Sequence, residues 1–558
     1  MNIFKKGSLV LGTLLIAAAC QDLEVTNQNA PGPAQALSTP EAVENVVTSA
    51  FGLWWGRLHN SGDVFNYYPD ASGAFVRSWS SRGVIPGQKP RVELENDPEA
   101  ASQWIPRASW DRFASSMANA NDGLRVINDG MRIEVAPPDV EEGDADFELE
   151  DQTDRVVAFA RFMQGLSLGY MGLVHDQAAP ANETTVIGGP LEWEGPNLTP
   201  YDELIEIAVG HLEQAIEVAE TTGPWVMHEG YIHNQVYTNE DLIKAANTLI
   251  ARLLVLGART PEERAAVDWA RVRDHALEGL DFDFGPEGEA PDVMRSLFIQ
   301  RVYLNINNGQ IYRVGPRVLG MADVSGNFHE WLSQDLDFRE AFNIDSPDIR
   351  AQGPLDEEGE PTAGAYWTRN TFTIHNPDRG SYLGSFYIHN RRTLQGLGTL
   401  NSGLMPLLTA DENRLYLAEA YIHLDQPQLA ADLINETRMR PQMIGGTGGA
   451  IVDQGLDPVT ADGVPQSDTC VPRAYFGAAP VGGPCGTLTD ALLYERAMEL
   501  MDMDPMRAWM DFRGFGFLPE GQLVQMPVPG RYLVSMALPI YTFGGIGGEG
   551  SAPGYPMP

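Results

Sequence analysis

Two short strings of residues look like motifs that carry chemistry in other proteins. Gly165-Leu166-Ser167-Leu168-Gly169 has the G-x-S-x-G spacing of a nucleophilic serine, which requires a strand, a sharp turn and then a helix. Here the string lies within residues 154–174, whose apolar residues recur with the period of one continuous amphipathic helix. We therefore interpret these small residues as a helix-packing surface, and we predict no catalytic serine.

The second string places two histidines around a glutamate, as zinc proteases do. His228 and His233 are five residues apart, whereas a helical zinc site needs a spacing of four. At five residues the second imidazole points about 140° away, because each helical residue turns by about 100°. Gly230 and Pro224 also disfavour a helix, so we expect a polar loop.

Acidic residues are abundant along the chain, so a pair of carboxylates does not by itself mark a hydrolase. The acid-rich stretch 139–154 lacks the glycine and the final glutamate of a calcium-binding loop, and we interpret it as a solvated charged loop. We predict no catalytic residue, no metal site and no cofactor.

The charge balance limits the classes of partner. Across 558 residues there are 37 Lys and Arg against 76 Asp and Glu, a formal net charge of −39. Such a surface repels the phosphates of nucleic acids, and it favours neutral or cationic ligands over anionic ones. A hydrophobic content of 43% is typical of a globular protein.

The N-terminus has the layout of a secretion signal. Lys5 and Lys6 precede the apolar run 9–16, and the small residues 17–19 precede Cys20. The apolar run is too short to span a bilayer, which takes about 20 residues. Three small residues before a cysteine resemble the bacterial lipobox, in which the cysteine is lipidated and becomes the mature N-terminus. The alternative is an ordinary signal peptide with an incidental cysteine.

The predicted signal and lipidation site divide the chain into three segments. We expect a lipoprotein signal peptide at 1–19, a lipidated tether at 20–40, and a single domain at 41–558. Gln21 is the second residue after the predicted cleavage site, where well-studied lipoproteins of the inner membrane carry Asp. By resemblance to lipoproteins without that Asp, this chain is expected to reach the outer membrane. A fully acylated Cys20 would be a stable anchor, because it carries more than one chain.

Two further cysteines lie in a Gly/Pro-rich stretch. Cys470 and Cys485 would meet an oxidising compartment in an exported protein, so a disulfide between them is plausible. The alternative is a pair of free thiols.

Helical periodicity dominates the predicted domain. Apolar residues recur at helical spacing from about residue 40, and again over 107–129, 154–174, 201–220, 240–258, 411–438 and 488–503. The segment 411–438 resembles a tetratricopeptide hairpin. Long Gly/Pro/Asn/aromatic stretches separate the helices, at 56–106, 175–200, 223–239, 281–410 and 441–486. The predicted fold is mainly α, with tetratricopeptide-like hairpins and long loop-rich insertions.

Several strings together resemble the SusD/RagB family of nutrient-uptake lipoproteins. In chain order they are Asp22–Asn27, Trp110–Phe113 with Ala118–Asn121, Arg161–Tyr170, Ala246–Leu253, Arg414–Tyr421, Leu433–Asn435 with Arg438–Arg440, and Tyr494–Leu500 followed by Arg507, Trp509, Asp511 and Arg513. The segment 501–505 departs from the turn usual in the family. Glu495 and Glu499 are expected to pair with Arg438, Arg440 or Arg513 and to tie helices together.

The resemblance implies a function as well as a SusD-like helical fold. Members of the family sit on the outer membrane over a SusC-like TonB-dependent transporter, capture glycans or in some cases peptides, and pass them in without breaking bonds. The chain is accordingly expected not to be an enzyme. Two alternatives remain open, a secreted helical glycan-active enzyme and a tetratricopeptide-type assembly scaffold without a small ligand.

A neutral sugar would need an aromatic platform with a few polar partners. The loops 56–106 and 300–390 contain such residues. The candidate ligand-binding side chains are Trp79, Trp104, Tyr366, Trp367, Tyr382 and Tyr387.

Overall fold

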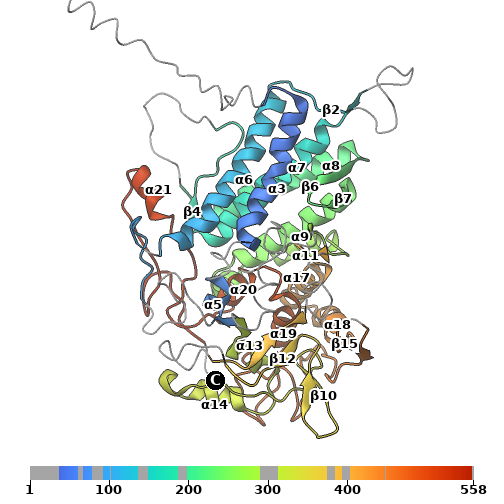
Figure 1. The fold of residues 1–558 in the computed structure, drawn as a ribbon, viewed down its shortest axis with the longest axis vertical. Coiled ribbons are helices and arrows are strands. Elements are labelled where there is room, and N and C mark those ends of the chain that lie inside the picture. Colours follow the sequence, from blue (N-terminus) through green and yellow to red (C-terminus); the bar gives the residue numbers. More distant parts are fainter. Residues whose placement is uncertain are drawn as a thin grey trace, which may run out of the picture.

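Long helices pack side by side in one half of the molecule, and shorter helices with two-stranded hairpins fill the other (Figure 1). The computed structural model describes residues 37–60, 67–77, 92–100, 102–135, 149–185, 198–288, 312–373, 384–391, 403–446, 448–504 and 506–555. The helices are α3 (Pro40–Asn60), α5 (Tyr68–Ser72), α6 (Trp104–Asn128), α7 (Thr153–Val174), α8 (Tyr201–Thr222), α9 (Asn239–Gly257), α10 (Pro261–Ala265), α11 (Trp269–Leu277), α13 (Pro316–Ala322), α14 (Asn327–Ser333), α17 (Ala410–His423), α18 (Pro427–Arg438), α19 (Leu488–Leu500), α20 (Arg507–Gly514) and α21 (Gly530–Ser535).

The helices predicted from periodicity are confirmed, and their starts follow local capping chemistry. Thr39 accepts a hydrogen bond from the backbone of Ala42 at the start of α3. The α9 and α19 helices each begin with a capping box, built by Thr238 with Asp241 and by Thr487 with Asp490. These caps satisfy backbone N–H groups that would otherwise lack a partner at the start of a helix.

The G-x-S-x-G string lies inside α7, as predicted, and serves helix packing. A Cβ atom at Gly165 would lie 2.5 Å from Leu212 Cγ of α8, and one at Gly169 would lie 2.6 Å from Leu253 Cδ1 of α9. Ser167 is buried and its Oγ contacts Ser116 Oγ of α6 at 2.9 Å. Small residues therefore let α7 approach α6, α8 and α9 closely.

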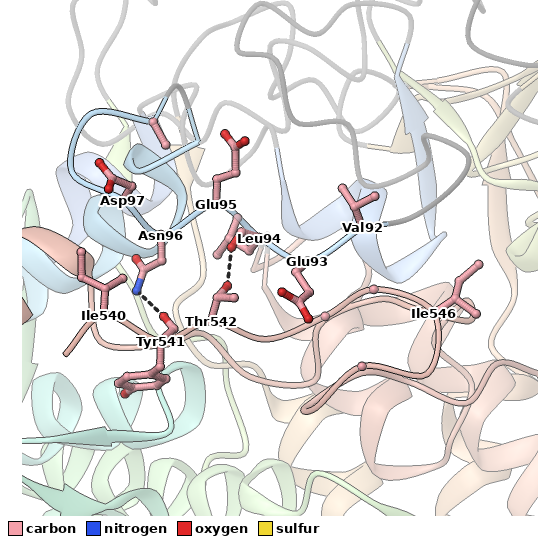
Figure 2. A pocket seen from close by; sticks show the side chains of 14 residues that line it. Val92, Glu93, Leu94, Glu95, Asn96, Asp97, Ile540, Tyr541, Thr542 and Ile546 are labelled. Atoms are coloured by element: carbon pink, nitrogen blue, oxygen red, sulfur yellow. Dashed lines mark hydrogen bonds between the residues drawn. The ribbon is translucent and has the colours of Figure 1, made fainter.

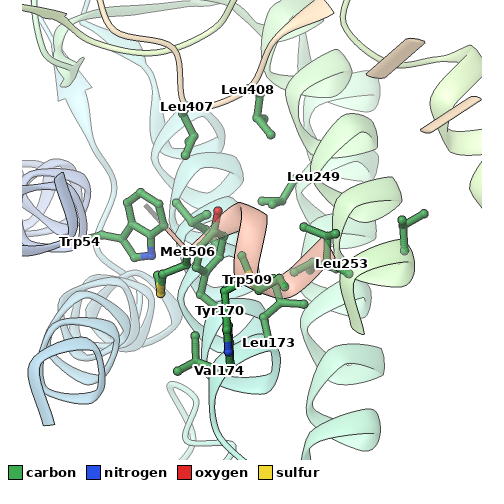
Figure 3. Packing of buried hydrophobic residues seen from close by; sticks show 14 of the residues in the cluster. Trp54, Tyr170, Leu173, Val174, Leu249, Leu253, Leu407, Leu408, Met506 and Trp509 are labelled. Carbon is green, nitrogen blue, oxygen red and sulfur yellow. The ribbon is translucent and has the colours of Figure 1, made fainter. Parts of the chain in front are cut away.

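The main hydrophobic core surrounds α7. Figure 3 shows Trp54 of α3 beside Tyr170 of α7, with Leu249 and Leu253 of α9 and Trp509 of α20 around them. The Trp54 and Tyr170 rings meet edge to face, with centroids 4.9 Å apart. None of the helices in the described ranges combines the length and the apolarity needed to cross a bilayer.

The strands of the described ranges are short and form antiparallel pairs. The pairs are β1 (Phe75–Arg77) with β9 (Tyr312–Val314), β2 (Glu134–Val135) with β3 (Glu150–Asp151), β4 (Gln177–Ala178) with β5 (Thr199–Pro200), β6 (Val226–Ile232) with β7 (Gln235–Thr238), β8 (Glu287–Gly288) with β14 (Gly403–Leu404), β10 (Gln352–Leu355) with β11 (Pro361–Ala363), β12 (Trp367–Arg369) with β13 (Tyr387–His389), and β15 (Gln442–Ile444) with β16 (Ala450–Val452).

The segment around His228 and His233 is a β-hairpin, so the expectation of a polar loop was wrong there. His228 lies on β6, and its Nε2 is 3.5 Å from Glu44 Oε1 of α3. His233 lies in the turn between β6 and β7. Tyr231 and Ile232, buried against the core, supply the apolar contacts that hold the hairpin in place.

Buried ion pairs join the C-terminal helices, but the predicted cations were only partly right. Glu495 and Glu499 of α19 share Arg350, whose Nη1 lies 2.7 Å from Glu495 Oε2 and 3.0 Å from Glu499 Oε1. Arg438 Nη1 lies 3.8 Å from Glu495 Oε1, which is a weaker contact. Arg391 Nη2 also pairs with Glu499, at 2.8 Å.

The other two arginines predicted as partners of these glutamates bind other groups. Arg440 pairs with Asp411 at the start of α17. Arg513 donates to the carbonyl oxygens of Leu173 and Leu256, near the C-terminal ends of α7 and α9. A guanidinium is favoured there because the carbonyl groups at a helix C-terminus carry partial negative charge.

The predicted tetratricopeptide hairpin consists of α17 and α18, which pack against α19. Two buried glutamates of α17 extend its contacts. Glu419 accepts hydrogen bonds from Arg264 of α10 at 2.7 Å and pairs with Arg496 of α19 at 2.5 Å. Glu412 pairs with Arg252 of α9. These pairs link the hairpin to the long helices in the other half of the molecule.

Candidate binding groove

The predicted aromatic platform does not form among the described residues. Trp104, Tyr366, Trp367 and Tyr387 are only 8%, 2%, 1% and 4% exposed. A ring this deeply buried presents no face to a ligand. Buried aromatic side chains most often serve to pack the core. Trp79 and Tyr382 lie outside the described residues and stay predictions.

The buried aromatic residues have structural partners instead. Tyr366 donates its hydroxyl to Glu499, 3.0 Å away, and burial raises the pKa of this tyrosine. The Tyr387 hydroxyl accepts a hydrogen bond from the Ile344 backbone at 3.0 Å. Trp367 lies on β12, opposite His389 of β13. Ligand contact is therefore expected at another surface.

The cysteines divide into two groups. Cys20 lies outside the described residues, so its lipidation stays a prediction. Cys470 and Cys485 are joined in a disulfide with an S–S distance of 2.02 Å, and both side chains are buried beside α18 and α19. The bond closes a Gly/Pro-rich loop against the tetratricopeptide-like hairpin.

An open groove of about 910 Å³ lies between two segments that are far apart in the sequence. One wall is the extended segment 92–97, with Ala100 at its end, and the other is the segment 540–548 near the C-terminus. Figure 2 shows the two segments running alongside each other. The first wall belongs to the loop region 56–106, which the sequence marks as a candidate ligand region.

Hydrogen bonds fix the two walls to each other. The Leu94 backbone donates to Phe543 O at 3.0 Å, and the Thr542 hydroxyl donates to Leu94 O. Asn96 is buried, and its Nδ2 donates to Tyr541 O and to Val528 O, each at 2.9 Å. The wall 92–97 is therefore held in an extended conformation by inward-pointing residues.

The exposed residues of the segment 92–97 are its acidic ones. Leu94 and Asn96 are buried, whereas Glu93, Glu95 and Asp97 are exposed. This alternation is the period of two expected for an extended chain. None of these three carboxylates forms an ion pair with a residue in the described part of the chain.

Apolar side chains stand at the edges of the groove. Val92, Ile540 and Ile546 are 74%, 41% and 56% exposed. Figure 2 shows them projecting on the same side as Glu95 and Asp97. The groove thus combines a row of carboxylates with exposed apolar groups, and its described lining residues include no Lys, Arg or His.

A buried cluster lies beneath the groove. The Tyr541 side chain points away from the opening (Figure 2), and its hydroxyl donates to the Asp176 carboxylate at 2.8 Å. The hydroxyl also accepts hydrogen bonds from Gln177 Nε2 and from the Val528 backbone, at 3.0 and 3.2 Å. Burial raises the pKa of Asp176 to about 6, against the opposing effects of Tyr541 and Arg259. This cluster fastens the second wall to the end of α7.

Only one wall of the groove could be predicted from a pattern in the sequence. Val92-Glu93-Leu94-Glu95-Asn96-Asp97 alternates in a way that predicts an extended segment with acids on one face. Nothing local predicts that Ile540 and Tyr541 lie opposite it, because more than 440 residues separate the two walls. Within the described ranges, no group of three or more His, Cys, Asp or Glu side chains is arranged to hold a metal ion.

Neither the protein-family models nor the curated proteins include a match to this sequence. Similar chains are found among solved structures. A SusD superfamily protein from Parabacteroides distasonis ATCC 8503 has 11% identity and a TM-score of 0.49, with coverage of 90% of this chain and 97% of that one. One from Bacteroides vulgatus ATCC 8482 has 12% identity and a TM-score of 0.47, with coverage of 89% and 90%.

A SusD-like protein from Bacteroides thetaiotaomicron VPI-5482 is also similar, with 12% identity, a TM-score of 0.44, and coverage of 85% of this chain and 86% of that one. At such identities and TM-scores the likeness identifies no ligand and no partner for this chain. These solved structures come from the same family, SusD, that the sequence motifs of this chain resemble.

Proposed function

We propose that this chain is a lipoprotein of the outer membrane that captures a nutrient, a glycan or a peptide, and delivers it to a SusC-like TonB-dependent transporter. In this proposal Cys20 carries the lipid anchor, and the chain itself breaks no bonds. The helical half is the scaffold, and the groove between segments 92–97 and 540–548 is the place where the ligand first binds.

The observation that carries the proposal is this open groove, with a volume of about 910 Å³, beside a helical scaffold. Binding sites are typically concave and largely preformed. The ordered SusD/RagB-like strings of the sequence support the proposed pathway to a transporter. Several of them supply buried ion-pair residues, such as Arg252, Glu419 and Arg496, so they account for the scaffold and leave the loops to determine the ligand.

The partner is tested by isolating the full-length lipoprotein from the outer membrane of the cells that make it, after mild cross-linking. We expect a TonB-dependent transporter to co-purify and to be identified by mass spectrometry. A Cys20→Ala variant provides the control, because without its lipid the chain should leave the membrane fraction and lose the transporter. Recovery of the chain with no transporter, from a membrane fraction that contains one, would contradict the proposal.

A further inference from the structure

We infer that the groove between segments 92–97 and 540–548 accepts an extended cationic oligopeptide in which basic residues alternate with apolar ones. The inference rests on the proposed function, because it names the ligand class for the same groove. It follows from the shape of the groove, from the chemistry of its two sides, and from the absence of any cation among its described lining residues.

The spacing of the carboxylates matches an extended peptide. Glu95 and Asp97 are exposed alternate residues of one extended segment and project on the same side (Figure 2), so their positions are about 7 Å apart along the wall. An extended peptide places its own alternate side chains at the same interval. Two basic residues at alternate positions would therefore meet Glu95 and Asp97, without a bend in either chain.

The apolar side of the groove supplies a second requirement. Val92, Ile540 and Ile546 are exposed and lie on the same side as Glu95 and Asp97, whereas the Glu93 side chain points toward the segment 540–548 (Figure 2). A purely charged ligand would leave these surfaces in contact with water. Apolar residues between the basic ones would cover them, and burial of such surfaces favours binding by about 25 cal/mol per Å².

The same chemistry disfavours the other ligand classes. A neutral sugar binds through stacking on an aromatic face, and the one aromatic ring among the described lining residues, Tyr541, points below the groove. An anionic glycan or peptide would meet three carboxylates in a chain whose net charge is −39. A cationic peptide gains from both features.

The test measures binding of fluorescent octapeptides to the purified full-length lipoprotein in neutral detergent. The probes are alternating Lys-Val, Ser-Val and Glu-Val peptides, together with a neutral hexasaccharide as a competitor. We expect the Lys-Val peptide to bind at least about tenfold more tightly than the others, because ion pairs with the carboxylates of the wall add to the apolar contact. The affinity should fall as salt rises from about 50 to about 500 mM, since salt screens exposed charges.

Two matched triple variants locate the site. Glu93→Gln with Glu95→Gln and Asp97→Asn should weaken Lys-Val binding about tenfold. The control, Glu357→Gln with Glu358→Gln and Glu360→Gln, removes the same charge from the exposed turn between β10 and β11 and should leave the affinity within about twofold. Both triple variants alter exposed side chains, so an unchanged Tm verifies their folding.

Three results would overturn the inference. They are equal binding of the Ser-Val peptide, displacement of the Lys-Val peptide by the hexasaccharide at equal concentration, and equal weakening by the two triple variants. These measurements use no transporter. Selective peptide binding without transporter association would therefore contradict the proposed function alone, and transporter association without this selectivity would contradict the inference alone.

Discussion

Arg350 illustrates how single buried residues hold this scaffold together. Its guanidinium contacts Asp348, Glu495 and Glu499, and all four side chains are fully buried. Burial of one charge is tolerated only when its partners remain in place. The sequence predicted that the two glutamates need cations, but Arg350 lies 145 residues before Glu495 and no local pattern connects them.

The first prediction concerns removal of this cation. Arg350→Met should lower the free energy of unfolding by about 3–5 kcal/mol, because it leaves three carboxylates buried with too little compensation. Urea unfolding at neutral pH measures the loss. The matched control is Arg369→Met, at an exposed position on β12, where the loss should stay below about 1 kcal/mol. Similar losses in the two variants would contradict the buried role of Arg350.

The second prediction concerns Asp176 beneath the groove. Burial raises the pKa of its carboxyl to about 6 in the folded protein, from its ordinary value of 3.8. The folded chain therefore binds this proton more tightly than the unfolded chain, and the contribution of Asp176 to stability falls as pH rises from about 4 to about 6. The full difference is about 3 kcal/mol.

Asp176→Asn removes this dependence. Relative to the unmodified protein, the variant should gain up to about 3 kcal/mol of stability between pH 4 and pH 7, in addition to any constant loss from altered hydrogen bonds. Urea unfolding of both proteins at the two pH values checks the prediction. If the difference between the two proteins were the same at both pH values, Asp176 would not titrate in this range.

At the scale of elements, the sequence predicted the helices well and their mutual arrangement poorly. The periods of α3, α7, α8, α9 and α19 are local properties, and capping residues such as Thr238 and Thr487 mark their starts. The contacts between elements depend on residues that are distant in sequence. The aromatic residues on β12 and β13 show the limit of prediction from sequence. Composition alone does not distinguish an aromatic residue that contacts a ligand from one that packs in the core.

The third prediction tests the packing of α7 against α8. Gly165→Ala should lower the free energy of unfolding by about 1–3 kcal/mol, because the new Cβ would overlap Leu212 and lie 2.9 Å from Ala208 O. The control is Gly210→Ala, also within a helix, where no atom lies within 4 Å of the new Cβ. There we expect a gain of about 0.5–1 kcal/mol from the higher helix propensity of alanine. A loss at both positions would contradict the close approach at Gly165.

At the scale of the whole molecule, the groove lies between the segment 92–97 and the segment 540–548, which are far apart in the sequence. A sequence pattern shows only one side of such a site. The alternating acids of 92–97 predict an extended acidic segment, whereas no pattern in the Gly-rich segment opposite them predicts its contacts. Gly544 and Gly545 adopt φ values of 96° and 80°, which let the chain turn back beside Glu93.

In the proposed function, the groove and the N-terminal anchor act together. The lipid on Cys20 would hold a strongly acidic protein at the membrane, and the groove would concentrate cationic peptides there, since a negative surface attracts them over roughly 10 Å. Under the proposed function, the anchor and the groove are both needed for delivery. Loss of either one should reduce uptake while leaving the fold unchanged.

The most direct measurement is uptake of the fluorescent Lys-Val octapeptide by cells that make the unmodified chain, Cys20→Ala, or the triple variant of Glu93, Glu95 and Asp97. We predict that both variants reduce the initial uptake rate about tenfold, in proportion to the lost capture step. The triple variant of Glu357, Glu358 and Glu360 should retain the full rate. Unchanged uptake in both the Cys20→Ala cells and the groove-variant cells would contradict the claim that this chain captures a nutrient for transport.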